Sequence, residues 1–296
     1  MLARDTPRGL RDFLRTLNDR IKKGEPLGDA LLQQRPRVSE LEATIITAAG
    51  RSGRLDRGCD QLARYFEALG RARGAVFSRS TYSVVMVHLT LFVVKLPVLI
   101  GSGVGVYLRA VAGQLIIIYA LVAGIWLGWK SLVDAARRNV AVDKTLRRIP
   151  GLGSIREKFA LARFFSTLDA QLEAQVNIWD AFANAARTSD SARIIHAARE
   201  AMPMLQSGER LSEALAKKKV IPEEYVRSFR VAEETGELDA ELTALAQRSE
   251  ELAVAALNRW AEWLPKMIYV AMLAYAGWQI VSWYSGYLKS LDTIGQ

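Results

Sequence analysis

The twenty residues AVAGQLIIIYALVAGIWLGW, from Ala110 to Trp129, carry no formal charge. An α-helix rises about 1.5 Å per residue, so this stretch would measure about 30 Å, the thickness of a bilayer's hydrocarbon core. A helix is the expected form, because backbone groups in lipid find no water to bond. The buried core helix of a soluble protein is the alternative. We interpret the stretch as a membrane-spanning helix.

Two further stretches have the same character. Ser80 to Val94 is fifteen residues without a charge, with apolar residues resuming after Lys95, and Met267 to Leu288 is twenty-two. We therefore predict an all-α polytopic membrane protein with three transmembrane helices, at about 80–104, 110–129 and 263–288. Aromatic residues at the ends of the spans fit the two interfacial layers of a bilayer. They are Trp126, Trp129, Trp260, Trp263, Trp283, Tyr284 and Tyr287.

The composition limits what else the chain can be. Half of the 296 residues are apolar and 24% are charged, so spans and soluble segments must alternate. One cysteine excludes a disulfide framework, and two histidines leave little material for a metal centre. No Walker A, HExxH, GxSxG or EF-hand pattern occurs. We expect no enzymatic activity, no cofactor and no metal.

The basic residues predict an orientation. The segment from Lys130 to Arg163 carries nine Lys and Arg against three Asp and Glu. Such an excess stays on the cytoplasmic side. We therefore expect a cytoplasmic N-terminus, an outside hairpin near Gly101 to Gly105, and an outside C-terminus. This topology accounts for the net charge of +9 without nucleic acid, and the basic segment could also touch anionic lipid.

The soluble segments show helical periodicity, with apolar residues at spacings of three and four. Breakers such as Pro26, Pro222 and Gly236 separate the helical runs. We predict five consecutive parts in the chain. They are a cytoplasmic bundle at 1–79, a transmembrane hairpin at 80–129, a second cytoplasmic bundle at 130–262, a third span at 263–288 and an outside tail at 289–296.

The two soluble segments contain matching blocks. GEPLGDAL at Gly24–Leu31 matches GERLSEAL at Gly208–Leu215, an offset of 184. SGRLD at Ser52–Asp56 matches TGELD at Thr235–Asp239, an offset of 183. Chance similarity between helices rich in Leu and Ala could give one such block, but hardly several in the same order. The pattern predicts an internal duplication.

The repeated residues suggest caps and turns. We expect Asp29 and Ser212, or residues beside them, to cap a short helix in each copy. Gly53 and Gly236 separate two long amphipathic helices, where a helix end takes the left-handed conformation that glycine tolerates.

Two ionisable residues lie inside the first predicted span. Such groups are costly in lipid and often mark a transport pathway. His88 is either a neutral contact between helices or part of a path for protons or peptide. Lys95 lies near the outer end of the span, where its ammonium could reach the headgroups.

Three motifs carry a resemblance to a known family. They are IPGLGSIREKFALARFFSTL at Ile149–Leu168, AEETGELD at Ala232–Asp239, and Pro265. In this order they resemble the type II secretion system F family, the inner-membrane platform proteins of type II secretion systems and type IV pilus machines. The resemblance implies a cytoplasmic bundle, a transmembrane pair, a second bundle and a final transmembrane helix.

The chain departs from the family pattern at several positions. Ala232 stands where the family has a glycine, and Gln175 stands where it has a second one. Glu233 keeps the family's acidic position in the second copy, whereas Ala49 and Gly50 occupy the corresponding pair in the first. The first bundle is shortened to about four helices, which fits either a divergent subfamily or a truncated chain.

The resemblance implies a non-enzymatic platform that couples an assembly ATPase to extension of a pilus or pseudopilus. Its expected partners are that ATPase, other inner-membrane assembly components, pilin or pseudopilin subunits and membrane lipid. A homo-oligomer is expected because the small first bundle buries its apolar faces poorly. The alternative class is a small transporter or channel using His88 and Lys95. Secretion system, type IV pilus and adherence-pilus variant remain open.

An acidic face of the second copy is the candidate docking site. It lies near the glycine turn and comprises Glu233, Glu234, Glu237 and Asp239. One alternative is a solvated helix surface, where ion pairs contribute little. Another is a divalent-cation site, because such ions prefer oxygen ligands. Docking of the ATPase through charge is the specific hypothesis, and it should weaken with salt.

Overall fold

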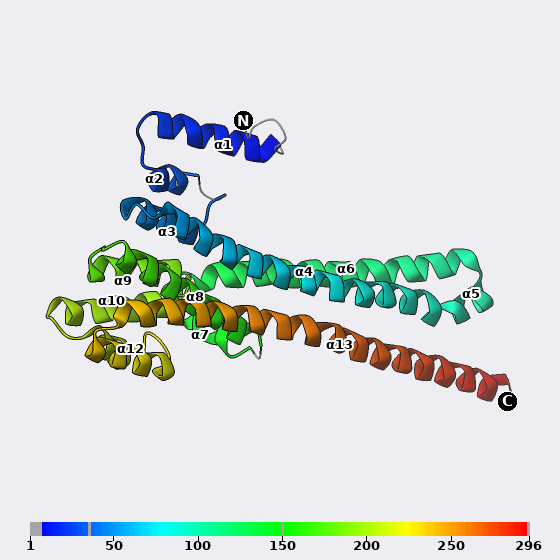
Figure 1. Ribbon diagram of the computed structural model, residues 1–296. Coiled ribbons are helices and arrows are strands. Elements are labelled where there is room, and N and C mark those ends of the chain that lie inside the picture. Colours follow the sequence, from blue (N-terminus) through cyan, green and yellow to red (C-terminus); the bar gives the residue numbers. More distant parts are fainter. Residues whose placement is uncertain (1–7, 35–36, 150, 295–296) are drawn as a thin grey trace. The chain divides into compact units, whose positions relative to one another are not determined.

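The computed structural model describes residues 8–34, 37–149 and 151–294, which are helical with no strand among them (Figure 1). Pro36, Pro150 and the end of the expected tail, Gly295–Gln296, lie outside the described residues. The helices are α1 (Arg8–Lys22), α2 (Leu27–Leu32), α3 (Glu40–Arg51), α4 (Leu55–Val94), α5 (Leu96–Ser102), α6 (Val104–Ala136), α7 (Val140–Arg147), α8 (Leu152–Glu173), α9 (Ile178–Thr188), α10 (Ala192–Gln206), α11 (Leu211–Lys217), α12 (Glu223–Thr235) and α13 (Leu238–Ile294).

The helices group into two compact units. The first, which we call the core unit, comprises residues 1–69 and 134–256. The second, which we call the apolar unit, comprises residues 70–133 and 257–296. Both predicted soluble segments thus contribute to one compact unit. The duplication of the segments stays a prediction from the sequence.

Aromatic side chains from three helices fill the centre of the core unit. Phe164 and Phe165 on α8 are fully buried, as are Phe182 on α9 and Phe229 on α12. The Phe165 and Phe229 rings stack with centroids 6.1 Å apart, and Phe164 meets Phe182 edge-on at 5.9 Å. Burying each such side chain stabilises the fold by about 1.5–3 kcal/mol. The apolar spacing of three and four along α8 therefore places its residues in the core, as expected.

The N-terminal segment supplies helices α1 to α4 and packs on another side of α8. Leu41 and Ile45 of α3 form a small cluster with Ala170 of α8, and Leu62 and Tyr65 of α4 pack against it. Local sequence explains where α3 begins, since the Ser39 hydroxyl accepts from the backbone N–H of Glu42 in a capping box. Helix α8 therefore has neighbours from both segments.

Among the residues described, two helical segments are long and apolar enough to cross a membrane, and the greater part of each belongs to the apolar unit. They are Leu55–Ser102 and Val104–Ala136. The chain reverses between them at Gly103, whose φ of +80° suits glycine, inside the expected hairpin. Large apolar side chains on these helices are exposed, for example Ile116 at 68% and Ile125 at 71%. Such a surface is typical of contact with lipid or a partner.

The third predicted span lies within α13, which continues through Pro265 without a break. It is not one of the two segments that are long and apolar enough to cross a membrane. The expected tail from Lys289 is also helical as far as Ile294. The third span stays a prediction.

Candidate docking face and membrane groove

The carboxylate of Glu233 accepts two hydrogen bonds within the core unit. Its two carboxylate oxygens accept hydrogen bonds from the backbone N–H groups of Leu211, at 2.8 Å, and Ser212, at 3.0 Å. These donors belong to the first turn of α11, where helical N–H groups lack partners within the helix. The carboxylate of α12 therefore caps α11 from a neighbouring helix.

The caps expected from the repeat are not those in the structure. The residue preceding α11 is Arg210, which makes no side-chain cap, and the residue preceding α2 is Pro26. Ser212 lies inside the first turn of α11, where its buried hydroxyl has no partner within the described residues. The expected cap by Ser212 was wrong because the helix begins one residue before it, at Leu211, and Glu233 reaches the free N–H groups instead.

The other three residues of the predicted docking face are exposed. Glu234 lies 3.7 Å from the guanidinium of Arg210, and Glu237 and Asp239 flank the start of α13. The turn between α12 and α13 therefore presents carboxylates to its surroundings, while Glu233 beside them is half-buried and occupied.

The glycines of the two copies have matching backbone geometry. Gly53 and Gly236 have φ angles of +70° and +76°, the left-handed region expected for them. The residue after each glycine donates the same backbone hydrogen bond, to the carbonyl five positions earlier. Arg54 N–H donates to Ala49 O at 2.9 Å, and Glu237 N–H donates to Ala232 O at 3.0 Å.

Gln175 is a non-glycine residue in the same conformation. Its φ is +55°, just after α8 ends. A side chain there is strained, because Cβ approaches the following carbonyl oxygen. This strain gives a physical reason for the glycine that the family resemblance places at the position.

A polar cavity in the core unit was not predicted. It has a volume of about 300 Å³ and lies between α4, α8 and α13. Asp169 in its wall accepts a hydrogen bond from the Thr243 hydroxyl at 2.8 Å, and Glu250 accepts one from Ser166 at 2.6 Å. The sequence carries no local signal for it, since the residues are 74 and 84 positions apart.

Burial controls the ionisation of these carboxyls. Removal from water raises the pKa of Asp169 to about 6; the nearby carboxylates of Glu173 and Asp239 act in the same direction, and the Thr243 hydrogen bond opposes them. Burial also raises the pKa of Glu250. Glu173, which lines the same cavity, pairs with Arg54 at 2.7 Å and with Arg57, so an ion pair links α4 to α8.

In the apolar unit, His88 joins two helices. Its Nδ1 lies 2.7 Å from the Val84 carbonyl oxygen and its Nε2 lies 2.7 Å from the Tyr119 hydroxyl of α6. A neutral imidazole satisfies both contacts, with one nitrogen donating and the other accepting. His88 therefore makes the contact between helices that one of its two predicted roles requires.

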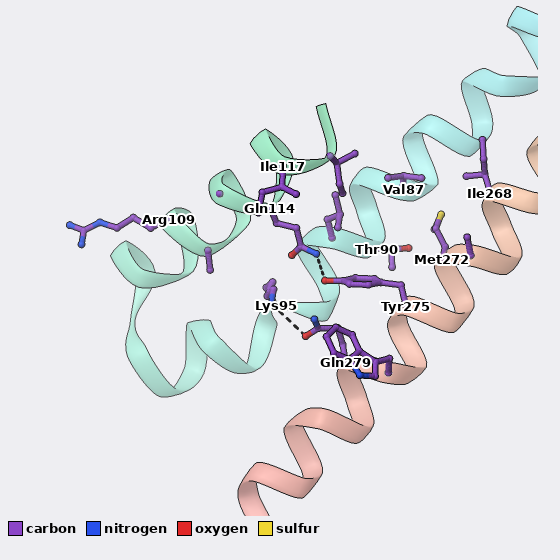
Figure 2. Close-up of a pocket in the computed structure, with 16 residues that line it drawn as sticks. Val87, Thr90, Lys95, Arg109, Gln114, Ile117, Ile268, Met272, Tyr275 and Gln279 are labelled. Atoms are coloured by element: carbon purple, nitrogen blue, oxygen red, sulfur yellow. Dashed lines mark hydrogen bonds between the residues drawn. The ribbon is translucent and has the colours of Figure 1, made fainter. Parts of the chain in front are cut away.

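Lys95 lies at the break between α4 and α5, and its ammonium points toward α13. Its Nζ donates to Gln279 Oε1 at 3.5 Å (Figure 2). One helical turn before Gln279 on α13, the Tyr275 hydroxyl accepts a hydrogen bond from the Gln114 amide. The Oε1 of Gln114 is buried without a partner among the described residues. The lysine therefore bonds a neutral group on a neighbouring helix.

These contacts border an apolar groove. It has a volume of about 780 Å³ and is lined by residues of α4, α6 and α13 that all belong to the apolar unit. Figure 2 shows Lys95 and Gln279 toward one end and Val87 and Ile268 toward the other. The groove is large enough for a ligand-sized molecule, for which sites measure about 300–1,000 Å³.

Comparison with known proteins identifies what the chain is similar to. The model of the family "type II secretion system (T2SS), protein F" matches residues 1–102 and 164–286. A type IV pilus assembly protein PilC of Pseudomonas aeruginosa is 21% identical over 98% of this chain and 83% of its own length. PilC of Thermus thermophilus is 27% identical over 90% and 71%. Type II secretion system protein F of Xanthomonas campestris is 25% identical over 92% and 72%.

Proposed function

The chain belongs to the type II secretion system protein F family, and from this membership we propose that it is a non-enzymatic inner-membrane platform. It couples a cytoplasmic assembly ATPase to extension of a pilus or pseudopilus built from pilin-like subunits. Similarity to proteins named for type IV pilus assembly and for type II secretion supports the general role. The genes that neighbour its own gene would identify which of the two machines it serves.

The observation that carries the coupling is the extent of two helices. Helix α4 contributes residues to the core unit up to Leu69 and to the apolar unit from Gly70, and α13 does so on either side of Ala256. No loop interrupts either helix at these positions. We take each of these helices to be the element through which one unit acts on the other.

An uninterrupted α4 is testable with a proline. Arg73 is an exposed residue of α4 in the apolar unit, near its boundary with the core unit. Arg73→Pro removes a helical hydrogen bond and kinks the helix at a cost of about 3 kcal/mol, whereas Arg73→Ala keeps the helix intact. In a strain lacking the native gene, the alanine variant supports filament assembly or secretion. The proline variant inserts into the membrane but does not support filament assembly or secretion.

The same bacterial strain serves to test whether the chain binds the assembly ATPase. The native full chain, tagged and extracted from membranes, is expected to copurify the assembly ATPase of its host. Full filament assembly or secretion by Arg73→Pro would contradict the coupling, and failure to retain any assembly ATPase would contradict the platform role.

The proposed topology has three spans, with the third in α13, a cytoplasmic N-terminus and an outside C-terminus. The test labels single cysteines in intact cells after the exposed native Cys59 is replaced by serine. A membrane-impermeant thiol reagent is expected to modify Gly103→Cys and to spare Arg187→Cys. Labelling of Arg187→Cys and not of Gly103→Cys would show that the chain has the reverse orientation.

Docking of the ATPase is proposed at the carboxylates of the α12–α13 turn. Glu234, Glu237 and Asp239 are exposed there, and Glu233 holds α11 beside them. Charge complementarity steers and selects partners, so this contact should be sensitive to ionic strength.

A further inference from the structure

The groove of the apolar unit has a charged end and an apolar end. Lys95 and Arg109 lie at the end near the α5–α6 turn, and the Arg109 side chain extends away from α13 (Figure 2). The aliphatic side chains of Val87, Ile117 and Ile268 line the rest. This layout matches an amphiphile with an anionic head and an apolar tail.

The chain supplies no counter-ion for Lys95 in this region. The sequence has no Asp or Glu from Ala68 to Val133, and none from Trp263 to Leu291. The neutral amide of Gln279, at 3.5 Å, is the contact that the ammonium makes on α13. A cation in an apolar setting is costly unless it is paired or reaches the headgroups. An anion from outside the chain would complete this end of the groove.

The length of the groove distinguishes between anionic occupants. Along α13 its lining runs from Ile268 to Gln279, twelve residues whose eleven rises correspond to about 16 Å of helix. A hydrocarbon core is about 30 Å thick, so the groove is about half as long as the core is thick. A spanning helix of a partner would need a track twice as long.

We propose that this groove binds one anionic glycerophospholipid. The phosphate lies at Lys95, with Arg109 adding positive potential at the same end, and an acyl chain lies along Val87, Ile117 and Ile268. The inference goes beyond the platform role and rests only on the proposed membrane-spanning arrangement. Resistance of the chain to carbonate extraction from membranes tests that arrangement separately.

The first experiment measures headgroup preference. The full chain in detergent is mixed with dioleoylphosphatidylglycerol or dioleoylphosphatidylcholine, which have the same tails, and bound lipid is counted by native mass spectrometry. The native chain should retain the anionic lipid preferentially, and Lys95→Gln should reduce that retention about fivefold, as expected for one lysine near a lipid headgroup. The matched control is Lys130→Gln, which neutralises a lysine stacked on Trp126 outside the groove.

The second experiment locates the tail. A phosphatidylglycerol with a photoreactive acyl chain should form adducts on groove residues such as Met272. Ala271→Phe fills the groove without changing charge and should abolish those adducts. The control Ala274→Phe enlarges another α13 residue, outside the lining, and should leave them unchanged. This pair keeps the test decisive should Lys95→Gln fail to fold.

Several results would overturn the proposal. They are equal retention of the two lipids by the native chain, an undiminished preference in Lys95→Gln, or adducts that persist in Ala271→Phe. A copurified transmembrane polypeptide that displaces phosphatidylglycerol from the native chain would assign the groove to a helix instead.

Discussion

Oε1 of Glu233 lies 2.8 Å from the backbone nitrogen of Leu211, so a side chain of α12 caps the first turn of α11. The second oxygen bonds Ser212 N–H at 3.0 Å. At the corresponding position of the predicted first copy the sequence has Gly50, which has no side chain to play this part. The acidic position in the second copy therefore has a structural role independent of any partner.

The first prediction concerns this cap. Glu233→Ala leaves two N–H groups of a partly buried helix end unpaired, so we expect the free energy of unfolding to fall by about 1–2 kcal/mol. The measurement is thermal unfolding of the full chain in detergent, followed by circular dichroism. The control Glu234→Ala removes an exposed carboxylate next to it and should change stability by less than about 0.5 kcal/mol. Equal melting temperatures for the two variants would exclude the cap.

The second prediction concerns the exposed carboxylates. Neutralising Glu234, Glu237 and Asp239 as amides should weaken recruitment of the assembly ATPase to membranes, most strongly at low salt. Recruitment is measured by cosedimentation with the membrane fraction over a range of salt concentrations. The matched control neutralises Glu223 and Glu224 at the opposite end of α12, where both are exposed. Normal recruitment by the triple variant would show that these carboxylates are only solvated surface.

The third prediction concerns pH. The pKa of Asp169 is raised from 3.8 to about 6 in the folded chain, chiefly by burial. The folded state then binds this proton more tightly than the unfolded state. Stability should therefore fall as pH rises from about 4 to about 6, and the full penalty should persist above pH 6.

Replacing this carboxyl by an amide should remove that penalty. Asp169→Asn is expected to be more stable than the native chain at neutral pH, by on the order of 1–3 kcal/mol, and close to it near pH 4. Melting temperatures across this range check the result. Asp134→Asn, at an exposed carboxylate paired with Arg137, should show no such trend. A native-like pH dependence in Asp169→Asn would reject the assignment.

The fourth prediction concerns backbone strain. Gln175 has a φ of +55°, so Gln175→Gly should stabilise the chain by about 1 kcal/mol. Its neighbour Ala174 has a φ of −79°, and Ala174→Gly should destabilise it by a similar amount. Thermal unfolding of both variants provides the comparison. A lower melting temperature for Gln175→Gly would mean that the Gln175 side chain contributes more than the strain costs.

Local patterns predicted much of the helical architecture. The uncharged stretch at Ala110–Trp129 lies inside α6, and Gly53 and Gly236 adopt the left-handed turns. The boundary between the first bundle and the first span is predicted at residues 79–80, and α4 runs across this position from Leu55 to Val94. No proline interrupts that stretch, and neither Gly70 nor Gly74 has a positive φ or a neighbour within 4 Å of the place of a Cβ.

The sequence by itself determined the helices, the apolar stretches and the turn glycines, because these follow from charge, periodicity and backbone freedom within a few residues. Only the tertiary structure decided that Glu233 caps α11, that Asp169 and Glu250 share a cavity wall, and that Lys95 faces Gln279. Each of these depends on side chains from separate helices, up to 184 positions apart, meeting across a packed interface. The raised pKa values of Asp169 and Glu250 come chiefly from burial, which no local pattern encodes.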